Sequence, residues 1–462
     1  MTGSMQDRSH VRARRRLSPL TAPAAFLAAC GLLLNLVPPR AAQAQTGPRP
    51  NILVILTDDQ RAEGTLGVMP KTRKLFVAGG TIFKNAVATT PLCCPSRASI
   101  LSGRYAHNHG VTDNFSAGLL DQRKTMQKEL QASGYLTAAT GKFLNGWRKD
   151  PSYFDRWAIY SPPPRYFGAT FRIDGVVREV PGYSTTALGQ LSLDILNDFE
   201  AQDDSPWFMQ VAPFAPHGPA RPDTRYAFAD VPERKQNPAL REEDISDKPF
   251  YVQATPAKKW RVRDSRRQQL RTLMSVDDMV AGIFSRLEEM GEADNTLAIF
   301  MSDNGFLWYE HQSAGKGEPY DESVEIPLLA RWPGHIPAGA KSRRIVANID
   351  VAATAYAAAG VEPGYRVDGK PLFDSDRPYI FLEYLLSGEG AEIPRWHSLW
   401  TPNSSFIRYF DAPESYEYYS PADPWQLTNL YGDGIAGNEP SRETRLLRRL
   451  RRSATCAGRS CK

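Results

Sequence analysis

Four short apolar runs, separated by helical patterns, place the strongest constraint on how this chain can fold. The runs cover residues 52–56, 135–140, 207–212 and 296–301. A continuous apolar run of this length is typical of a strand that is buried on both faces, as in a parallel sheet. Helical patterns cover residues 125–132, 185–199, 267–290 and 350–359. The alternation predicts an α/β fold in which helices sandwich a mostly parallel central sheet.

Polar side chains follow the first and last of these runs at their carboxyl ends, where open α/β sheets bind ligands. Asp58 and Asp59 follow the first run, and Asp303 and Asn304 follow the last one. Neighbouring carboxylates repel each other unless a cation lies between them. Carboxylate and amide oxygens are the ligands that a hard cation prefers. The sequence therefore predicts a divalent cation at this edge of the sheet.

Basic side chains follow the two middle runs. Lys142 comes after the second run, His217 after the third, and Lys316 lies downstream of the last run. Each of them, taken alone, could be an ordinary surface residue. Their repeated placement near the same sheet edge favours a binding site for an anionic group.

The segment Pro91–Arg104 combines two cysteines, a proline and a helical pattern. Proline suits the first turn of a helix, because its missing N–H would be unpaired there anyway. We therefore expect Cys93 just ahead of a helix N-terminus, where backbone N–H groups favour anionic groups. Arg97 follows four residues later, about one helical turn on, and can point its guanidinium at the same place. Taken alone, the pattern could also be two ordinary buried or metal-binding thiols.

Residues 1–44 have the features of an export signal. Arginines between positions 12 and 16 precede an apolar stretch from Leu20 to Val37, and Ala42-Gln43-Ala44 offers a small-residue cleavage site. Pro23 interrupts the stretch, which is short for a membrane-spanning helix. We expect cleavage after Ala44, no stable membrane insertion and a secreted or extracytoplasmic mature protein. The arginine cluster also leaves twin-arginine export open.

The formal net charge of +5 comes entirely from this leader. Residues 1–44 hold six arginines and one aspartate, and removing them from totals of 56 and 51 leaves 50 basic and 50 acidic residues. A neutral mature chain gives no bulk basicity for nucleic-acid binding. The 462 residues exceed what one hydrophobic core usually serves. We expect a catalytic domain over 45–375 and a smaller C-terminal α+β subdomain with a basic tail over 376–462.

The C-terminal tail carries two further features. Leu446, Leu447 and Leu450 have a helical spacing among arginines, which predicts a packed terminal helix. Cys456 and Cys461 could close a short disulfide loop in an oxidising compartment, or they could remain free thiols.

Together these elements resemble the type I, formylglycine-dependent sulfatases of the alkaline-phosphatase-like superfamily. Cys93-x-Pro-Ser-Arg followed by Ser-Gly-Arg is similar to the family signature, and the segments 51–59 and 302–305 are similar to its two metal-binding segments. The resemblance implies that the fold is alkaline-phosphatase-like and that the chain is a sulfuric ester hydrolase. It implies these metal ligands: Asp58, Asp59, Cys93, Asp303 and Asn304. It implies that these residues act on the sulfate group: Cys93, Arg97, Lys142, His217 and Lys316.

The resemblance also implies how such a site is assembled. In this family the signature cysteine is oxidised to formylglycine, whose hydrate is the nucleophile, so formylglycine-generating machinery is an expected partner. One divalent cation, Ca²⁺, is expected from the all-oxygen protein ligands. The expected substrates are sulfated small molecules or glycans. Three alternatives remain open: a phosphomonoester or phosphonate hydrolase of the same superfamily, a non-catalytic binder of sulfated glycans, and an enzyme that uses the cysteine itself.

Two positions depart from the common family pattern. Gly141-Lys142-Phe143-Leu144-Asn145 stands where many members have Gly-Lys-Trp-His-Leu, which removes the usual histidine two residues after the lysine. Together with Arg104–His109, this segment resembles the N-acetylglucosamine-6-sulfatase and arylsulfatase branch, which suggests 6-sulfated N-acetylglucosamine as a substrate. Glu325 stands where many members have arginine. Both changes predict that the substrate pocket differs from the pocket of either branch of the family.

Overall fold

The computed structural model describes residues 49–202, 205–234, 237–254, 259–386, 392–411, 415–432 and 440–461. Residues 45–462 form one compact unit. The predicted export signal lies outside the described residues. Within the described ranges, no helix combines the length and apolar character that crossing a membrane requires.

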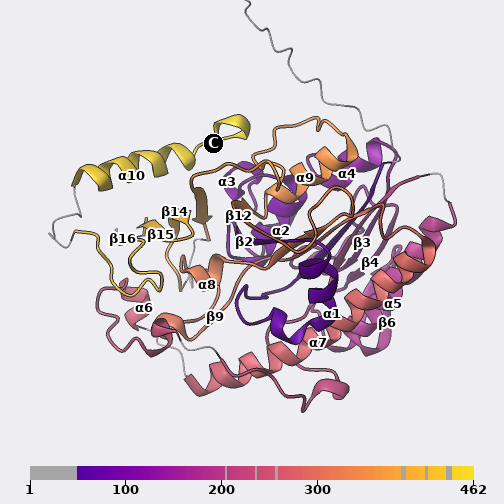
Figure 1. Cartoon of the computed structure of the whole chain (residues 1–462), viewed down its shortest axis with the longest axis horizontal. Coiled ribbons are helices and arrows are strands. Elements are labelled where there is room, and N and C mark those ends of the chain that lie inside the picture. The colour runs from indigo at the N-terminus through magenta and orange to yellow at the C-terminus, as the bar shows by residue number, and fades with distance from the viewer. Residues whose placement is uncertain are drawn as a thin grey trace, which may run out of the picture. The chain divides into compact units, whose positions relative to one another are not determined.

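Strand β1 (Asn51–Thr57) lies in the middle of a ten-stranded sheet. Figure 1 labels several strands of this sheet, which lies among the helices. Strand β1 runs parallel to β7 (Trp207–Ala212) on one side and to β8 (Thr296–Ser302) on the other. Strand β3 (Leu136–Gly141) continues the parallel centre beside β7. The four apolar runs therefore form four adjacent parallel strands, as predicted, and their carboxyl ends meet at one edge.

The outer strands make the sheet mixed, and its order is β12-β2-β11-β8-β1-β7-β3-β4-β5-β6. Beyond β8 lie β11 (Leu328–Arg331), β2 (Thr81–Val87) and β12 (Ala340–Ala347). Beyond β3 lie β4 (Arg156–Tyr160), β5 (Phe167–Ile173) and β6 (Val176–Tyr183). Strand β11 is antiparallel to both of its neighbours, and β5 is antiparallel to β4 and β6.

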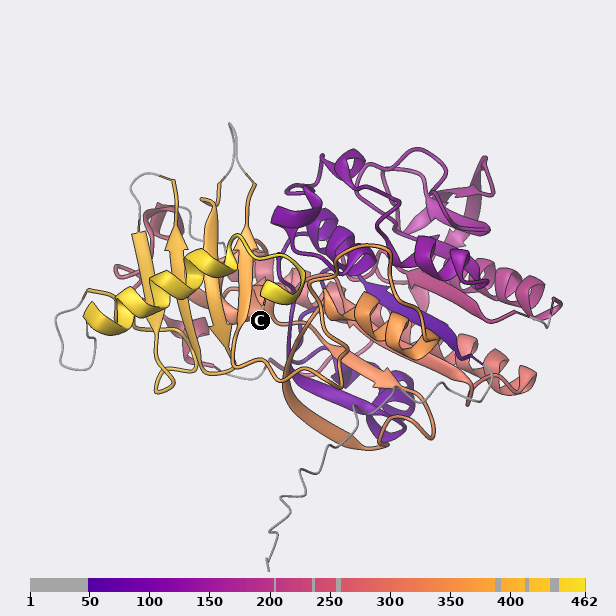
Figure 2. The ribbon, with the colours of Figure 1, turned by 90° about the horizontal axis from the view of Figure 1, so that it is seen from above.

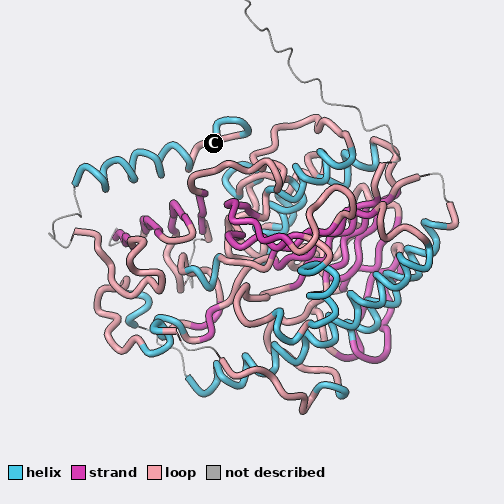
Figure 3. Tube along the Cα trace, in the orientation of Figure 1, coloured by secondary structure: helices cyan, strands magenta, loops and turns pink. Residues whose placement is uncertain are grey.

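Alternate side chains of β1 enter two separate apolar cores, one on each face of the sheet. Ile52, Val54 and Leu56 belong to one core, whereas Leu53 and Ile55 belong to the other, and all five are fully buried. The helices over the first face are α2 (Cys93–Ser102), α4 (Met126–Ala132) and α9 (Asp350–Ala359). Those over the second are α5 (Ser184–Glu200) and α7 (Lys259–Met290). Figure 3 shows these helices on both faces of the strands, which confirms the predicted sandwich.

A second, antiparallel sheet follows near the C-terminus. Its strands, in order, are β13 (Ile380–Tyr384), β14 (Trp396–Thr401), β15 (Ser404–Tyr409) and β16 (Ser415–Tyr419). Helix α10 (Pro440–Ser453) lies across this sheet (Figure 2), and its Leu450 is buried in the same apolar cluster as the sheet. The predicted packed terminal helix is confirmed. Cys456 and Cys461 form a disulfide.

Short elements complete the fold. The short helices are α1 (Pro70–Thr72), α3 (Ala106–His109), α6 (Phe250–Ala254) and α8 (Asp321–Val324). A two-stranded hairpin pairs β9 (Leu307–Trp308) with β10 (Ala314–Gly315) just after β8. Lys316 follows this hairpin directly, so the hairpin brings the lysine back over the strand ends.

Candidate active site

The carboxyl ends of β1 and β8 bring three carboxylates and one amide together. The backbone N–H of Asp59 donates to Asp303 Oδ1 over 3.0 Å, and Asn304 Nδ2 donates to Asp59 Oδ1 over 2.8 Å. Asp58, Asp303 and Asn304 are fully buried, and Asp59 is 3% exposed. Three buried carboxylates at this spacing require positive charge nearby, because burial strengthens their mutual repulsion.

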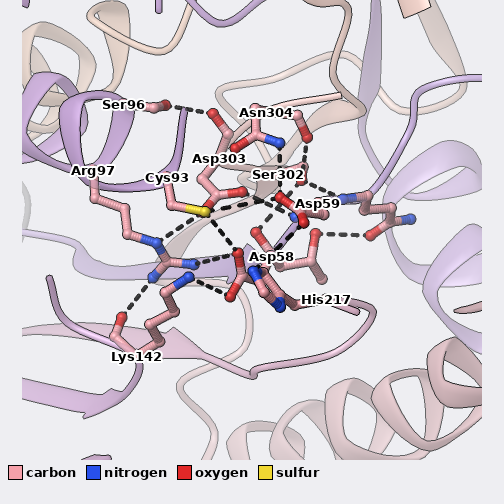
Figure 4. Close-up of polar contacts among 12 residues, drawn as sticks. Asp58, Asp59, Cys93, Ser96, Arg97, Lys142, His217, Ser302, Asp303 and Asn304 are labelled. Atoms are coloured by element: carbon pink, nitrogen blue, oxygen red, sulfur yellow. Dashed lines mark hydrogen bonds and ion pairs between the residues drawn. The ribbon is translucent and has the colours of Figure 1, made fainter. Parts of the chain in front are cut away.

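Helix α2 carries Cys93 to this cluster. Cys93 is the first residue of the helix rather than the residue ahead of it, because Leu92 has an extended backbone and is the N-cap. Its Sγ lies 3.4 Å from Asp58 Oδ1 and 3.8 Å from Asp59 Oδ1 (Figure 4). The prediction that Cys93 stands at a helix N-terminus over the strand-end acids is confirmed, with this shift of one position.

Three basic side chains surround the acids (Figure 4 labels Arg97 and Lys142). Lys142 Nζ donates to Asp58 Oδ2 over 2.6 Å, and Arg97 Nε donates to Asp303 Oδ2 over 2.8 Å. Lys316 Nζ donates to Asp59 Oδ1 and lies 2.6 Å from Cys93 Sγ. Each acid of the cluster thus accepts a hydrogen bond from a different basic side chain.

His217 approaches from the loop after β7. Its Nε2 lies 3.7 Å from Asp59 Oδ2, while its Nδ1 lies 2.6 Å from the carbonyl oxygen of Gly218. A carbonyl only accepts, so Nδ1 carries a proton and Nε2 is the nitrogen that can take or give one. The ring stacks on Phe214 with a centroid distance of 4.9 Å, which fixes its orientation.

The surroundings set the ionisation of these groups. Burial raises the pKa of Asp58, but Lys142, His217 and Arg97 outweigh burial and hold that pKa below its usual range. Asp59 behaves in the same way, chiefly through Lys316, and its pKa is lowered. Burial raises the pKa of the Cys93 thiol far above its ordinary value, although Lys142 and Lys316 oppose this shift. The unmodified thiol is therefore protonated at neutral pH and is a poor nucleophile.

A set of neutral groups behind the cluster holds its geometry, and these groups were not predicted from the sequence. Ser96 Oγ donates to the carbonyl of Asp303 and accepts from Asn348 Nδ2 over 2.8 Å. The backbone N–H of Gln60 donates to Ser302 Oγ over 2.8 Å, and that hydroxyl donates to the carbonyl of Asn304. Ser96 and Ser302 lie within the two motifs that resemble the family, so their place in those motifs could have marked them as supporting residues. Asn348 had no such signal.

Gly141 allows Lys142 to reach the cluster. Its backbone is left-handed, with φ of +84°, and a Cβ there would lie 2.0 Å from the carbonyl oxygen of Ala212 on β7. The N–H of Lys142 donates to that same oxygen over 2.7 Å. Only glycine fits here, where the end of β3 lies against the backbone of its neighbour β7.

The two departures from the common family pattern lie at different places. Leu144, where the histidine is missing, is 3% exposed and belongs to the apolar core beneath the site. Glu325 lies beside Asp321, whose carbonyl accepts its backbone N–H over 2.7 Å, and not among the cluster acids. Burial, with Asp321 and Glu322 nearby, raises the pKa of Glu325 well above its ordinary value.

The donor atoms suit a divalent cation. Ligand atoms of Asp58, Asp59, Cys93 and His217 all lie within 4.8 Å of one another. Asn304 Oδ1 is buried and has no hydrogen-bond partner. An unpartnered buried carbonyl oxygen beside three carboxylates is what a hard cation would satisfy.

Comparisons with known proteins agree with this geometry. Residues 50–361 match the family model described as Sulfatase, and residues 309–452 match the one described as N-sulphoglucosamine sulphohydrolase, C-terminal. The chain is 32% identical to the N-acetylglucosamine-6-sulfatase of Homo sapiens over 397 residues, which cover 75% of this chain and 68% of that protein. It spans only 48% and 32% of two extracellular sulfatase homologues, from Caenorhabditis elegans and Drosophila melanogaster.

Solved structures give the same picture. A structure described as a complex with its substrate D-glucosamine-2-N,6-O-disulfate aligns with a TM-score of 0.75 and 25% identity, covering 87% of this chain and 97% of that one. The phosphonate monoester hydrolase of Agrobacterium radiobacter shares the fold, with a TM-score of 0.71 and 21% identity over 88% of this chain and 96% of that one.

Proposed function

This chain belongs to the sulfatase family, and we propose that it hydrolyses sulfate monoesters with a formylglycine made from Cys93. The observation that carries the proposal is the position of Cys93, at a helix start over three carboxylates and within 2.6 Å of Lys316 Nζ. A sulfate ester repels anionic nucleophiles, so its site must neutralise charge while holding an oxygen against sulfur. Cys93 has such surroundings.

We propose that Asp58, Asp59, Asp303, Asn304 and residue 93 hold one divalent cation, Ca²⁺. The unpartnered Asn304 Oδ1 and the all-oxygen set of protein side chains support this assignment. When bound, the cation would polarise a sulfate oxygen and favour the deprotonated nucleophile. When Cys93 is oxidised to formylglycine, the hydrated aldehyde supplies one hydroxyl to attack sulfur and a second that can expel sulfate afterwards.

The basic side chains would share the charge of the sulfate. Arg97, Lys142 and Lys316 are already fixed by the cluster acids, so they need no rearrangement as charge develops in the transition state. Arg97 Nη2 is buried without a hydrogen-bond partner, which leaves a donor for a sulfate oxygen.

His217 would give its proton to the leaving oxygen. Its Nδ1 is committed to the Gly218 carbonyl, so the mobile proton belongs to Nε2, the nitrogen that faces the cluster. As the bond between sulfur and the ester oxygen breaks, that oxygen takes the Nε2 proton and leaves as an alcohol. His217 would then act as the proton donor, although this chain lacks the histidine that many family members have two residues after the lysine.

Two matched cysteine variants test the nucleophile. Cys93→Ser keeps a hydroxyl of similar size but loses the aldehyde, so sulfate release should fall by at least about 10³-fold, because no second hydroxyl can expel the bound sulfate. Cys94→Ser is the control, since Cys94 contacts none of the cluster acids, and it should keep most activity. The mass of the tryptic peptide with residue 93 reports the conversion. A normal rate in Cys93→Ser would refute the assignment.

Substrate class is the next part of the proposal. We propose small aryl sulfates and sulfated sugars, such as 6-sulfated N-acetylglucosamine, on the strength of the relatives' names. The rival reading is phosphate or phosphonate ester hydrolysis, because the same cluster suits a phosphoryl group and a phosphonate hydrolase shares the fold. Rates on 4-nitrophenyl sulfate and 4-nitrophenyl phosphate separate the two. Activity on phosphate esters alone would favour the rival, and an unconverted Cys93 with retained sugar binding would favour a non-catalytic binder.

The remaining expectations concern the chain as a whole. We propose that the protein acts outside the cytoplasm after cleavage behind Ala44, that the formylglycine-generating machinery modifies it, and that 45–375 and 376–462 are its catalytic and C-terminal parts. Relatives named as extracellular sulfatases support the location. N-terminal sequencing of the exported protein would test the cleavage position.

A further inference from the structure

An apolar pocket of about 240 Å³ opens beside Lys142 and His217. Its walls come from the segment after β3 and from the loops after β4 and β7. The wall residues are Phe143, Leu144, Trp147, Tyr160, Phe214 and the prolines 162–164. We call it the Trp147 pocket. None of its lining residues is Asp, Glu or Arg.

We infer that the Trp147 pocket holds the ring of the leaving alcohol and selects a neutral ring over a ring with a second anionic group. The inference rests on the proposed function, which it extends from a reaction to a class of substrate. It concerns the sugar or aryl ring next to the sulfate, not the sulfate itself.

The position of the pocket assigns it to the leaving group. Lys142 and His217 line the pocket and also contact Asp58 and Asp59, the two acids under Cys93. The nucleophile reaches sulfur from the Cys93 side, so the ester oxygen must leave on another side, toward the proton of His217. The carbon skeleton attached to that oxygen then lies in the space next to His217, which is the Trp147 pocket.

The size and the walls point to a single ring. Pockets that enclose a whole drug-sized ligand measure roughly 300–1,000 Å³, so about 240 Å³ suits one six-membered ring. The ring of Trp147 is held edge-to-face on Phe143 at 5.3 Å, and the backbone N–H of Trp147 donates to the Leu144 carbonyl over 3.2 Å. A rigid, half-exposed indole can stack on an aryl ring or on the apolar face of a sugar.

The charges of the pocket explain the selection. Its basic lining residues are Lys142, whose ammonium is bound to Asp58 over 2.6 Å, and His217, whose Nε2 faces Asp59. A carboxylate or second sulfate on the ring would lose its hydration among apolar walls and find no free cation. An amide or hydroxyl on the same ring loses much less. The segment 143–147, which has Leu144 where many family members have histidine, thus contributes to the apolar lining of the pocket.

The test measures binding separately from turnover. Full-length protein with Cys93→Ala, which has no nucleophile at residue 93, is titrated calorimetrically with 4-carbamoylphenyl sulfate and 4-carboxyphenyl sulfate, two probes of nearly equal shape. We expect the neutral amide to bind at least about 10-fold more tightly than the carboxylate. Trp147→Arg or Asn145→Lys, each adding a cation to the lining, should reduce this ratio to near one or reverse it. Trp332→Ala, a half-buried tryptophan stacked on His335 in another pocket, is the control and should leave the ratio unchanged.

The outcomes separate the inference from the proposed function. Equal affinities, no binding of either probe, or an unchanged ratio in both charge-adding variants would overturn the inference. Sulfate release from the two probes by the protein with Cys93 intact is measured in parallel. Selective binding without any release would refute the proposed function alone, and release without selectivity would refute the inference alone.

Discussion

Replacing Arg97 should reveal how much the acid cluster depends on a single guanidinium. Arg97 is 1% exposed, donates from Nε to Asp303 Oδ2 over 2.8 Å and donates from Nη1 to the Lys142 carbonyl over 2.5 Å. Arg97→Met has a similar length but no charge, so Asp303 is left buried without its cation. Removing one partner of a buried pair costs about 3–5 kcal/mol. Arg97→Lys keeps the charge but cannot reach both acceptors, so we expect a loss of about 1–3 kcal/mol.

The activity of both variants should fall further than their stability suggests. If Arg97 stabilises the charge that develops on sulfate, kcat/KM should drop about 10²–10³-fold, as for loss of one preorganised donor. Added Ca²⁺ should recover part of the stability of Arg97→Met, because a bound cation compensates Asp303. It should not recover kcat/KM, because the guanidinium itself is missing.

Arg377 provides a matched control for this prediction. It forms a buried pair with Asp350, with distances of 2.6 and 2.7 Å, and Asp350 begins helix α9 rather than joining the acid cluster. Arg377→Met should lose a comparable free energy of unfolding and keep the kcat/KM of its folded fraction. Urea denaturation and initial rates on an aryl sulfate measure both quantities. An Arg97→Met variant as stable as the parent, or one no less active than Arg377→Met, would refute the reasoning.

Two further changes test the backbone and the electrostatics around the site. Gly141→Ala should lower the free energy of unfolding by about 1–3 kcal/mol because of the left-handed backbone, and by more because of the contact with Ala212. Gly110→Ala, with φ of +79° and nothing within 4 Å of its Cβ, should lose only the backbone part. Equal losses of unfolding free energy in the two variants would contradict this. Burial raises the pKa of Glu318 to about 8 from 4.5, and Glu392 adds to the shift. The folded protein therefore keeps a proton that the unfolded chain loses, so this residue lowers stability by up to about 5 kcal/mol as pH rises from about 4.5 to about 8. Glu318→Gln should abolish that loss. If the unfolding free energy of this variant changed between pH 5 and pH 8 as much as that of the parent, the prediction would be wrong.

The sequence predicted the centre of the fold because the central strands carry their own signal. Strands β1, β3, β7 and β8 are buried on both faces, so each is a continuous apolar run. Strand β12 contains Lys341, Arg343 and Arg344, and it lies at the exposed edge of the sheet. A strand of this kind has neither an apolar run nor a regular alternation, so only its pairing with β2 identifies it. The antiparallel placement of β11 likewise depends on contacts between distant segments.

The predicted site residues lie together in the structure for the same reason. Asp58, Lys142 and His217 each follow a strong strand signal, and the parallel pairing of those strands brings their side chains together. The supporting groups were missed because they act through tertiary contacts. Asn348, for example, lies more than 250 positions from Ser96, to which it donates, and nothing in its local sequence marks it. The apolar character of the Trp147 pocket likewise emerges only when three separate segments meet.

The complete burial of Cys93 has a consequence for the order of events in making the protein. The residue has no exposed surface in the folded structure, and Lys316, whose Nζ lies against its Sγ, comes 223 positions later in the chain. The conversion of Cys93 that we propose would therefore have to take place while the chain is still open, before those later parts of the fold are in place. Conversion and folding would then compete in time, and folding that finished first would leave the thiol unconverted. Protein refolded from a host without the modifying enzyme would stay inactive even when that enzyme is supplied afterwards.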